Sequence, residues 1–241
     1  MSMNEMDIAL PENFRNIVRL FPLPNLVLFP GVIQGLHLFE PRYRQLMVDA
    51  LDSDELISMA LLQPGWDQSL SDRPPVHPTV CIGKIVTHHR FDDGRYNLLL
   101  LGAQRARIVH ELSDDHPYSE RPYRMARVEV LTEEVGCEAE EAERIADQVL
   151  QMFRELVKWR ANDDEESIES LLQQNLSLGQ LLDLVSYSSD ACPEHQQQVL
   201  TELNTYQRAK IVIAHLQELH SCRRPQTRSG IEDFPPRFSA N

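Results

Sequence analysis

The stretches LFPLPNLVLFPG, residues 20–31, and LHLFEPRY, residues 36–43, carry most of the information about the fold. In the first stretch, Pro22 and Pro24 separate two short apolar runs, Ile17–Phe21 and Leu26–Phe29. Proline has no backbone N–H to donate to a sheet, so both runs are predicted to be strand ends or edge pieces. In the second stretch, Pro41 suits the first turn of a helix, where the missing N–H is not needed. A strand-rich opening that passes into a helix is therefore expected.

One helix and several short strands follow this opening. Apolar residues at positions 43, 46, 47, 50 and 51 recur with the spacing of a single helix face, and Asp52-Ser53-Asp54 ends the helix. Asp92-Asp93-Gly94 indicates a hairpin turn. Further strands are predicted for Leu56–Leu62, Thr79–His89, Tyr96–Leu101, Arg105–Leu112 and Tyr123–Leu131. Short strands around one helix predict a small, partly closed barrel or sandwich.

The apolar spacing changes after Thr132, where a period of two gives way to helical spacing. Helices are predicted for Ala142–Val157, Ile168–Leu176, Leu181–Tyr187, Pro193–Leu203 and Tyr206–Leu219, and Ser177 with Gln180 has the form of a capping box. The predicted fold class is α+β. The expected divisions are a flexible N-terminus over residues 1–14, a β-rich part over 15–132, a helical bundle over 133–220 and a disordered tail over 221–241.

The two opening stretches resemble the start of the Lon protease N-terminal domain family, whose signature runs roughly PLPxxvlFPG and then LxiFExRY. Later landmarks of the family follow in the same order, and the resemblance extends from about Ile17 to Leu219. The residues that match the structural motifs are Glu40, Arg42, Tyr43, Gly94, Gly102 and Arg105. The resemblance implies a PUA-like β pseudo-barrel with one helix, followed by a C-terminal α-helical bundle. It also implies a free-standing, non-catalytic module that binds polypeptides, without the ATPase and protease of the full enzyme.

The sequence lacks the motifs of those catalytic activities. Gly83-Lys84 has no preceding glycine of a GxxxxGK[ST] phosphate loop, so ATP binding is not predicted. Only three lysines occur, and none lies near a Gly-Pro-Ser-like segment, which argues against a Ser–Lys protease. Neighbouring side chains on a strand face opposite ways, so His88 and His89 are not expected to share a metal ion. We expect no catalytic residue, no metal and no cofactor.

The composition narrows the choice of partner and compartment. A formal net charge of -14 disfavours binding along a nucleic-acid backbone, which needs surplus lysine and arginine. The N-terminal residues lack the features of a secretory signal, and no apolar run approaches the ~18 residues of a membrane span. The four cysteines are widely spaced, as is typical of reduced thiols. A cytoplasmic protein that binds neither nucleic acid nor membrane is therefore expected.

Five apolar residues are candidates for contact with a bound polypeptide, with core packing as the competing interpretation. Four lie where Pro30 and Gly31 bend the chain, and a tryptophan in a proline-rich loop is of the kind found at binding hot spots. The candidates are Phe29, Val32, Ile33, Leu36 and Trp66. For Glu40 and Arg105 a structural role is expected: Glu40 accepts helix-start N–H groups and pairs with Arg105 across the barrel.

The expected partners are unfolded or specific client proteins, with a separate protease or ATPase considered as a further partner. Two other functions stay open. A basic groove would favour an RNA-binding PUA-like module, and a cluster of perturbed carboxylates or histidines in a pocket would favour a hydrolase with an unrecognised site.

Overall fold

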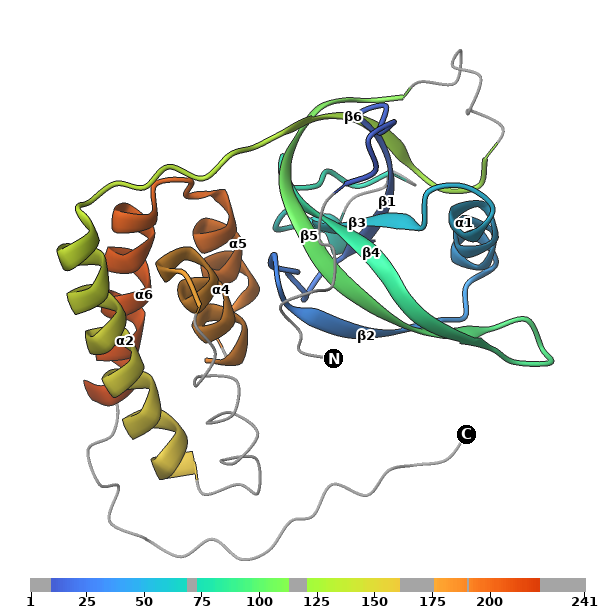
Figure 1. Cartoon of the computed structure of the whole chain (residues 1–241). Helices are drawn as coiled ribbons and strands as arrows, with labels where there is room; N and C mark the ends of the chain where they lie inside the picture. Colours follow the sequence, from blue (N-terminus) through green and yellow to red (C-terminus); the bar gives the residue numbers. More distant parts are fainter. Residues whose placement is uncertain (1–9, 69–72, 113–120, 161–175, 190, 222–241) are drawn as a thin grey trace, which may run out of the picture.

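The structure, a computed structural model, describes residues 10–68, 73–112, 121–160, 176–189 and 191–221. A β part and a helical part lie side by side, joined by the segment that follows the last strand (Figure 1). The β part contains β1 (Ile17–Leu23), β2 (Ile33–Leu38), α1 (Pro41–Leu51), β3 (Leu56–Leu61), β4 (Thr79–Arg90), β5 (Tyr96–Glu111) and β6 (Met125–Val130). The described helices beyond it are α2 (Ala139–Arg160), α4 (Leu178–Ser188), α5 (Pro193–Thr201) and α6 (Thr205–Ser221). The predicted α+β class, with one helix in the β part, is confirmed.

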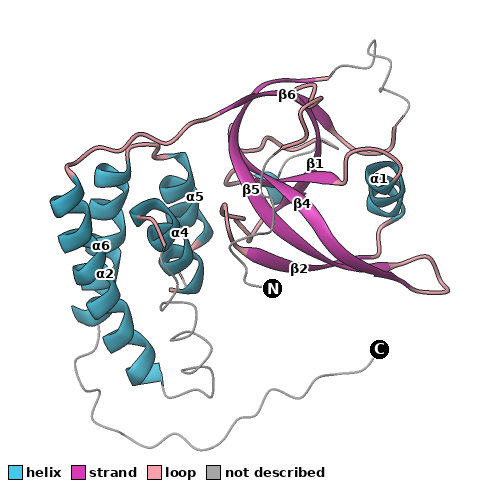
Figure 2. Cartoon of the chain, viewed as in Figure 1, coloured by secondary structure: helices cyan, strands magenta, loops and turns pink. Residues whose placement is uncertain are grey.

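The six strands form a ring-like sheet because β5 is long and bent (Figure 2). The sheet order is β2-β5-β4-β3-β1-β6, and β6 pairs again with β5. The first half of β5 pairs with β2 and its second half with β6. On its other side, β5 pairs with β4 along most of its length. Register shifts between Ile108 and His110, and at two places along β4, mark the irregular pairing that bends the strands. The predicted strands Tyr96–Leu101 and Arg105–Leu112 are thus parts of one strand.

The run Leu26–Phe29, expected as a strand, is instead a buried connection outside the sheet. The chain crosses the ring here in direct contact with Gly102, whose backbone N–H donates to the Val32 carbonyl at 2.8 Å. A Cβ atom on Gly102 would lie 2.0 Å from the Phe29 carbonyl oxygen, so only glycine fits at this crossing. Gly31 turns the chain with a φ of +76°, and β2 begins two residues later, at Ile33. The strand therefore lies after the turn, where a loop was expected.

Local patterns in both parts are reproduced in three dimensions. The predicted stripe of α1 is buried at Tyr43, Leu46, Met47 and Ala50. Gly94 has a φ of +83° in the turn between β4 and β5, as a tight hairpin requires. At the start of α4 the capping box is present: Ser177 Oγ accepts from the Gln180 N–H at 3.3 Å, and Ser177 N–H donates to Gln180 Oε1 at 2.9 Å. The predicted helix Ile168–Leu176 and the two predicted disordered ends fall largely or wholly outside the described residues.

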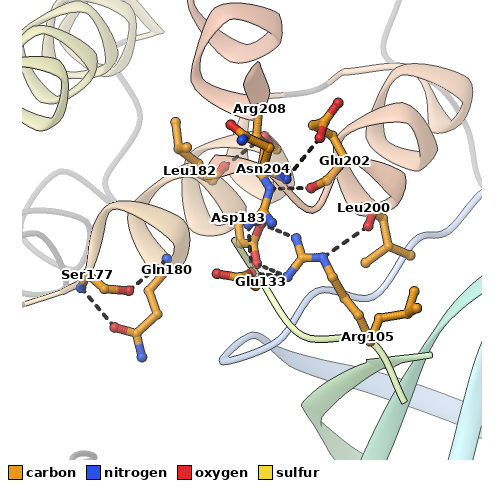
Figure 3. Close-up of polar contacts among 12 residues, drawn as sticks. Arg105, Glu133, Ser177, Gln180, Leu182, Asp183, Leu200, Glu202, Asn204 and Arg208 are labelled. Carbon is orange, nitrogen blue, oxygen red and sulfur yellow. Dashed lines mark hydrogen bonds and ion pairs between the residues drawn. The ribbon is translucent and has the colours of Figure 1, made fainter. Parts of the chain in front are cut away.

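A buried ion network joins the β part to the helical part (Figure 3). Arg105 on β5 makes a two-pronged contact with Asp183 on α4, with N–O distances of 2.6 and 2.8 Å. Its Nη1 also donates to Glu133 Oε1 at 2.7 Å, and its Nε donates to the Leu200 carbonyl at 3.0 Å. Arg208 on α6 reaches the same carboxylates, at 2.8 Å for Glu133 and 3.2 Å for Asp183. One cluster therefore ties together β5, the connecting segment and three helices.

The network is balanced, with two guanidinium groups facing two carboxylates. Burial is the largest single influence on the pKa of Arg105 and lowers it, but the charge and hydrogen bond of Asp183 together with the charge of Glu133 raise it by more, so Arg105 stays charged. The side chains of Arg105, Arg208 and Asp183 are 1%, 0% and 2% exposed. The expected pairing of Arg105 with Glu40 is wrong, because Glu40 pairs with Arg42 at 2.8 Å and Arg105 pairs with Asp183 and Glu133. Arg105 has a carboxylate partner, but that partner comes from the helical part.

We predict that Arg105→Met lowers the free energy of unfolding by about 3–5 kcal/mol, because it leaves an uncompensated carboxylate in the buried network. The measurement is denaturant unfolding followed by circular dichroism. The matched control is Arg107→Met two residues along β5, where both members of the Arg107–Glu129 pair are more than half exposed. That change should cost about 1 kcal/mol or less. Equal losses in the two variants would contradict a special role for the network.

A second prediction concerns the crossing at Gly102. Gly102→Ala should cost about 1–3 kcal/mol or prevent folding, because the added methyl group collides with the Phe29 backbone. Gly35→Ala is the control, since its Cβ would meet nothing nearer than Leu99 Cδ2 at 3.8 Å. Thermal unfolding of the two variants compares them directly. If Gly102→Ala melts with the parent, the chain crossing is not as close as described.

Candidate functional site

The five apolar candidate residues do not come together in one surface. Phe29 and Val32 are 0% and 5% exposed and belong to the core, so neither offers contact area to a partner. Ile33 and Leu36 are half-buried residues of β2. Trp66, at 40% exposure, follows β3, which β4 and β5 separate from β2 in the sheet order. The accessible candidates therefore form two separate places, at Trp66 and along β2.

Trp66 stands beside a cavity of about 330 Å³ in the surface of the β part. A short 3₁₀ turn, Trp66–Gln68, carries the indole, and Gly65 before it turns the chain with a φ of +83°. We call this cavity the Trp66 groove. Among the described residues, its lining includes three prolines, three aromatic residues, Leu62 and four arginines: Pro22, Pro74 and Pro122, Tyr43, Trp66 and Tyr123, and Arg42, Arg73, Arg121 and Arg124. The groove thus unites residues from β1, α1, the loop after β3 and the approach to β6.

The walls of the groove are rigid before any ligand arrives. Prolines have a fixed φ, and Tyr43 packs edge-on against Phe21 with ring centroids 4.4 Å apart. Arg42 lies over the other side of the Tyr43 ring, 4.7 Å from its centroid. Tyr123 donates its hydroxyl to Asp49, and burial followed by this hydrogen bond raises its pKa to about 12. The phenol therefore stays neutral, and a preformed apolar wall costs little conformational entropy on binding.

Three of the four groove arginines are held by carboxylates that are not among the described lining residues. Arg42 pairs with Glu40 at 2.8 Å and Arg121 with Asp49 at 2.8 Å. Arg124 donates its Nε to Glu111 Oε2 at 2.8 Å. Although the chain has a net charge of -14, none of the described residues that line the groove carries a carboxylate. The site can bind an apolar or mixed segment, and it presents polar donors at its edges.

Glu40 does not have the buried helix-capping role that was expected. It stands at the N-cap of α1, but its side chain makes no cap hydrogen bond and is 39% exposed. Its carboxylate faces Arg42, the next residue but one, whose Nε donates to it at 3.0 Å. The local reason is that the Arg42 guanidinium, which lines the Trp66 groove, binds the Glu40 carboxylate, so this carboxylate does not cap the helix N–H groups. Glu40 therefore positions a groove arginine.

The described residues show neither a metal-binding cluster nor a membrane span. No group of three or more His, Cys, Asp or Glu side chains in the described ranges is arranged to hold a metal ion. His88 lies near the Tyr96 ring and His89 near Phe91, in separate contacts. None of the described helices is both long enough and apolar enough to cross a bilayer.

The comparisons with known proteins agree with one another. Residues 17–218 match the family model described as the ATP-dependent protease La (LON) substrate-binding domain. The chain is 23% identical over 214 residues to a Lon protease of Dictyoglomus thermophilum, covering 89% of this chain and 26% of that protein. It is 24% identical over 202 residues to Lon protease 2 of Myxococcus xanthus, covering 84% of this chain and 24% of that protein. The chain therefore spans about a quarter of the length of these relatives.

Two solved structures share the fold. The N-terminal domain of a Mycobacterium avium complex Lon protease superposes with a TM-score of 0.63 at 18% identity, covering 84% of this chain and 98% of that one. A Lon N-terminal domain protein from Xanthomonas campestris gives a TM-score of 0.55 at 20% identity, with 82% and 97% covered. The arrangement of a ring-like sheet followed by helices is thus shared with solved Lon N-terminal domains.

From the geometry of Glu40 we predict that Glu40→Ala changes the free energy of unfolding by less than about 1 kcal/mol, as for other half-exposed ion pairs. Thermal unfolding gives the stability, and Asp183→Ala in the buried network, where the side chain is 2% exposed, serves as the contrasting variant. A loss with Glu40→Ala as large as that with Asp183→Ala would show that Glu40 is a buried acceptor after all.

Proposed function

The chain belongs to the ATP-dependent protease La (LON) substrate-binding domain family, and from this premise we propose that it binds unfolded or specific client polypeptides without catalysing a reaction. The family is defined by substrate binding, and its match covers residues 17–218. The region shared with the relatives amounts to 26% and 24% of their length. A separate protease or ATPase that receives the bound client is a further proposed partner.

The observation that carries the proposal is the Trp66 groove. Unfolded chains are recognised through apolar side chains, and Trp66 offers a large, 40% exposed indole between proline walls. The cavity of about 330 Å³ lies within the range of ligand pockets, which is about 300–1,000 Å³. Ile33 and Leu36 on β2 are proposed as a second set of contacts, whereas Phe29 and Val32 are buried in the core.

We propose a cytoplasmic location for this activity. The described cysteines, Cys81, Cys137 and Cys192, are free thiols. Free, widely spaced cysteines suit a reducing compartment.

A second candidate, RNA binding, is favoured by the arginines and aromatic rings of the same groove. Against it, three of the four arginines face a carboxylate within 2.8 Å, which neutralises the charge that a phosphate backbone would need. The net charge of -14 opposes it further. The two candidates differ in one measurable respect: RNA binding would weaken steeply as salt rises, and apolar binding would not.

We predict that Trp66→Ala weakens binding of a fluorescently labelled, reduced and carboxymethylated lactalbumin by about tenfold or more, which corresponds to ~1.4 kcal/mol. Ile33→Asp should weaken it as well, because a charge replaces apolar contact area on β2. Fluorescence anisotropy measures the affinity, and circular dichroism confirms that each variant melts with the parent.

The matched control is Gln151→Ala on the exposed face of α2, which should leave affinity unchanged. A labelled poly-uridine strand is titrated in parallel at two salt concentrations. Parent-like affinity of a folded Trp66→Ala would remove the groove from the proposal. Tight, salt-sensitive binding of the RNA without binding of lactalbumin would replace the proposal by its alternative.

A further inference from the structure

Strand β2 is an open edge of the ring-like sheet. It pairs with β5 alone, and no other strand of the described residues lies against its second side. In Figure 1 it runs along the rim of the β part, away from β1, β3 and β6. Proteins usually protect such an edge with a lysine, a proline or a bulge, because unpaired strand groups invite another chain. The sequence of β2, IQGLHL, contains no charged residue and no proline.

The hydrogen-bond register identifies which backbone groups face outward. Gly102 on β5 bonds across to the β2 side through both its N–H and its carbonyl. Because bonding alternates along an antiparallel pair, the next residues joined to β5 are Gln34, Leu36 and Leu38. The backbone groups of Ile33, Gly35 and His37 then point away from β5. Among the described residues, the one partner for these groups is the Gln34 side chain, which donates to the Gly35 carbonyl at 2.7 Å.

The open edge is held in strand geometry from both ends. Tyr187 on α4 donates its hydroxyl to Gln34 Oε1 at 2.6 Å, which connects the start of β2 to the helical part. At the other end, His37 Nδ1 lies 2.6 Å from Asn97 Oδ1 on β5. Leu38 is buried and anchors the strand in the core. Because β2 is already fixed in strand geometry, it loses little conformational entropy when another strand pairs with it.

The surface beside the edge is apolar and aromatic. Leu99, which stands opposite Gly35, is 41% exposed, and Phe39 just after β2 is 60% exposed. His37 stacks on Phe39 with ring centroids 6.1 Å apart. Gly35 at the centre has no side chain to block an approaching backbone. An added strand would find unpaired donors and acceptors together with contacts for its own apolar side chains.

We propose that β2 takes up an extended segment of a client polypeptide as an additional strand of the sheet. This inference rests on the proposed function and adds that the client is bound through its backbone as well as through its side chains. Backbone hydrogen bonds do not depend on sequence, so this mode suits clients that share only the absence of a fold. The Trp66 groove then selects an apolar side chain, while the edge holds the extended backbone at a separate place.

The first test replaces the central residue of the edge. Gly35→Pro removes one outward N–H and places a ring where the new strand would lie, and proline is tolerated on edge strands at such positions. Gly35→Ala keeps the N–H, and its Cβ has room at 3.8 Å from Leu99. We expect Gly35→Pro to weaken binding of the labelled lactalbumin by about tenfold and Gly35→Ala to bind within about twofold of the parent. Melting curves of both variants are measured alongside.

The second test uses the unaltered chain, so it does not depend on whether Gly35→Pro folds. The probes are three synthetic peptides of alternating valine and threonine with lysine ends. One is unmodified, one is N-methylated on alternate residues, which leaves one strand edge open, and one is N-methylated on two adjacent central residues, which blocks both edges. The first two should bind alike, and the third should bind at least about tenfold more weakly.

Each outcome decides between the two proposals. Equal binding of all three peptides, with lactalbumin bound as before by folded Gly35→Pro, would overturn the edge inference and leave the proposed function standing. Failure of the unaltered chain to bind lactalbumin or any peptide would overturn the proposed function itself. Light scattering measures the oligomeric state and so tests whether a second copy of the chain occupies the edge. A dimer of the unaltered chain that becomes monomeric in Gly35→Pro would assign the edge to a second copy and overturn its assignment to a client.

Discussion

The buried ion network around Arg105 and Asp183 is the interaction on which the architecture depends. A guanidinium from the middle of β5 is almost completely shielded from water, so it must find negative charge within hydrogen-bonding distance. Asp183 and Glu133 supply that charge from α4 and from the segment after β6, and Arg208 restores neutrality from α6. Because Arg105, Arg208 and Asp183 are almost fully buried and each would be an unbalanced charge without the others, the ring-like sheet and the helices are required to meet in one arrangement. Both carboxylates of the network, Asp183 and Glu133, come from segments that follow the last strand of the sheet.

The same arrangement determines which apolar residues are buried in the core and which stay exposed. The core of the ring is closed by the crossing chain at Phe29 and Gly102, which brings backbone against backbone and leaves no room for a side chain. Phe29 and Val32, which were expected to contact a bound polypeptide, are thereby buried in the core. Exposed apolar area remains at Trp66, where the short turn after β3 holds the indole out of the core, and along β2, whose outer side pairs with none of the described strands. Both places are preformed, so the protein itself loses little conformational entropy when it binds a flexible chain.

Charge is distributed unevenly enough to matter for recognition. The chain is strongly acidic, yet the lining of the Trp66 groove carries arginines whose counter-charges stand outside the cavity. The groove therefore offers guanidinium donors and aromatic rings without a strong positive potential. Such a surface suits apolar segments with polar groups nearby, which is what the proposed binding of unfolded chains requires.

The sequence by itself determined what depends on neighbours along the chain. The α1 stripe, the hairpin turn at Gly94, the capping box at Ser177 and the change from strands to helices follow from local spacing and local backbone preferences, and the motif order was enough to indicate the family. Only the tertiary structure decided the partner of Arg105, which lies 78 residues away, the burial of Phe29 and Val32, and the place of β2 beyond the Gly31 turn. It also brought Trp66 together with Tyr123 and its neighbouring arginines into one groove. Periodicity shows which face of an element is apolar, whereas burial and ion pairing depend on which distant segment covers that face, and no local pattern contains that information.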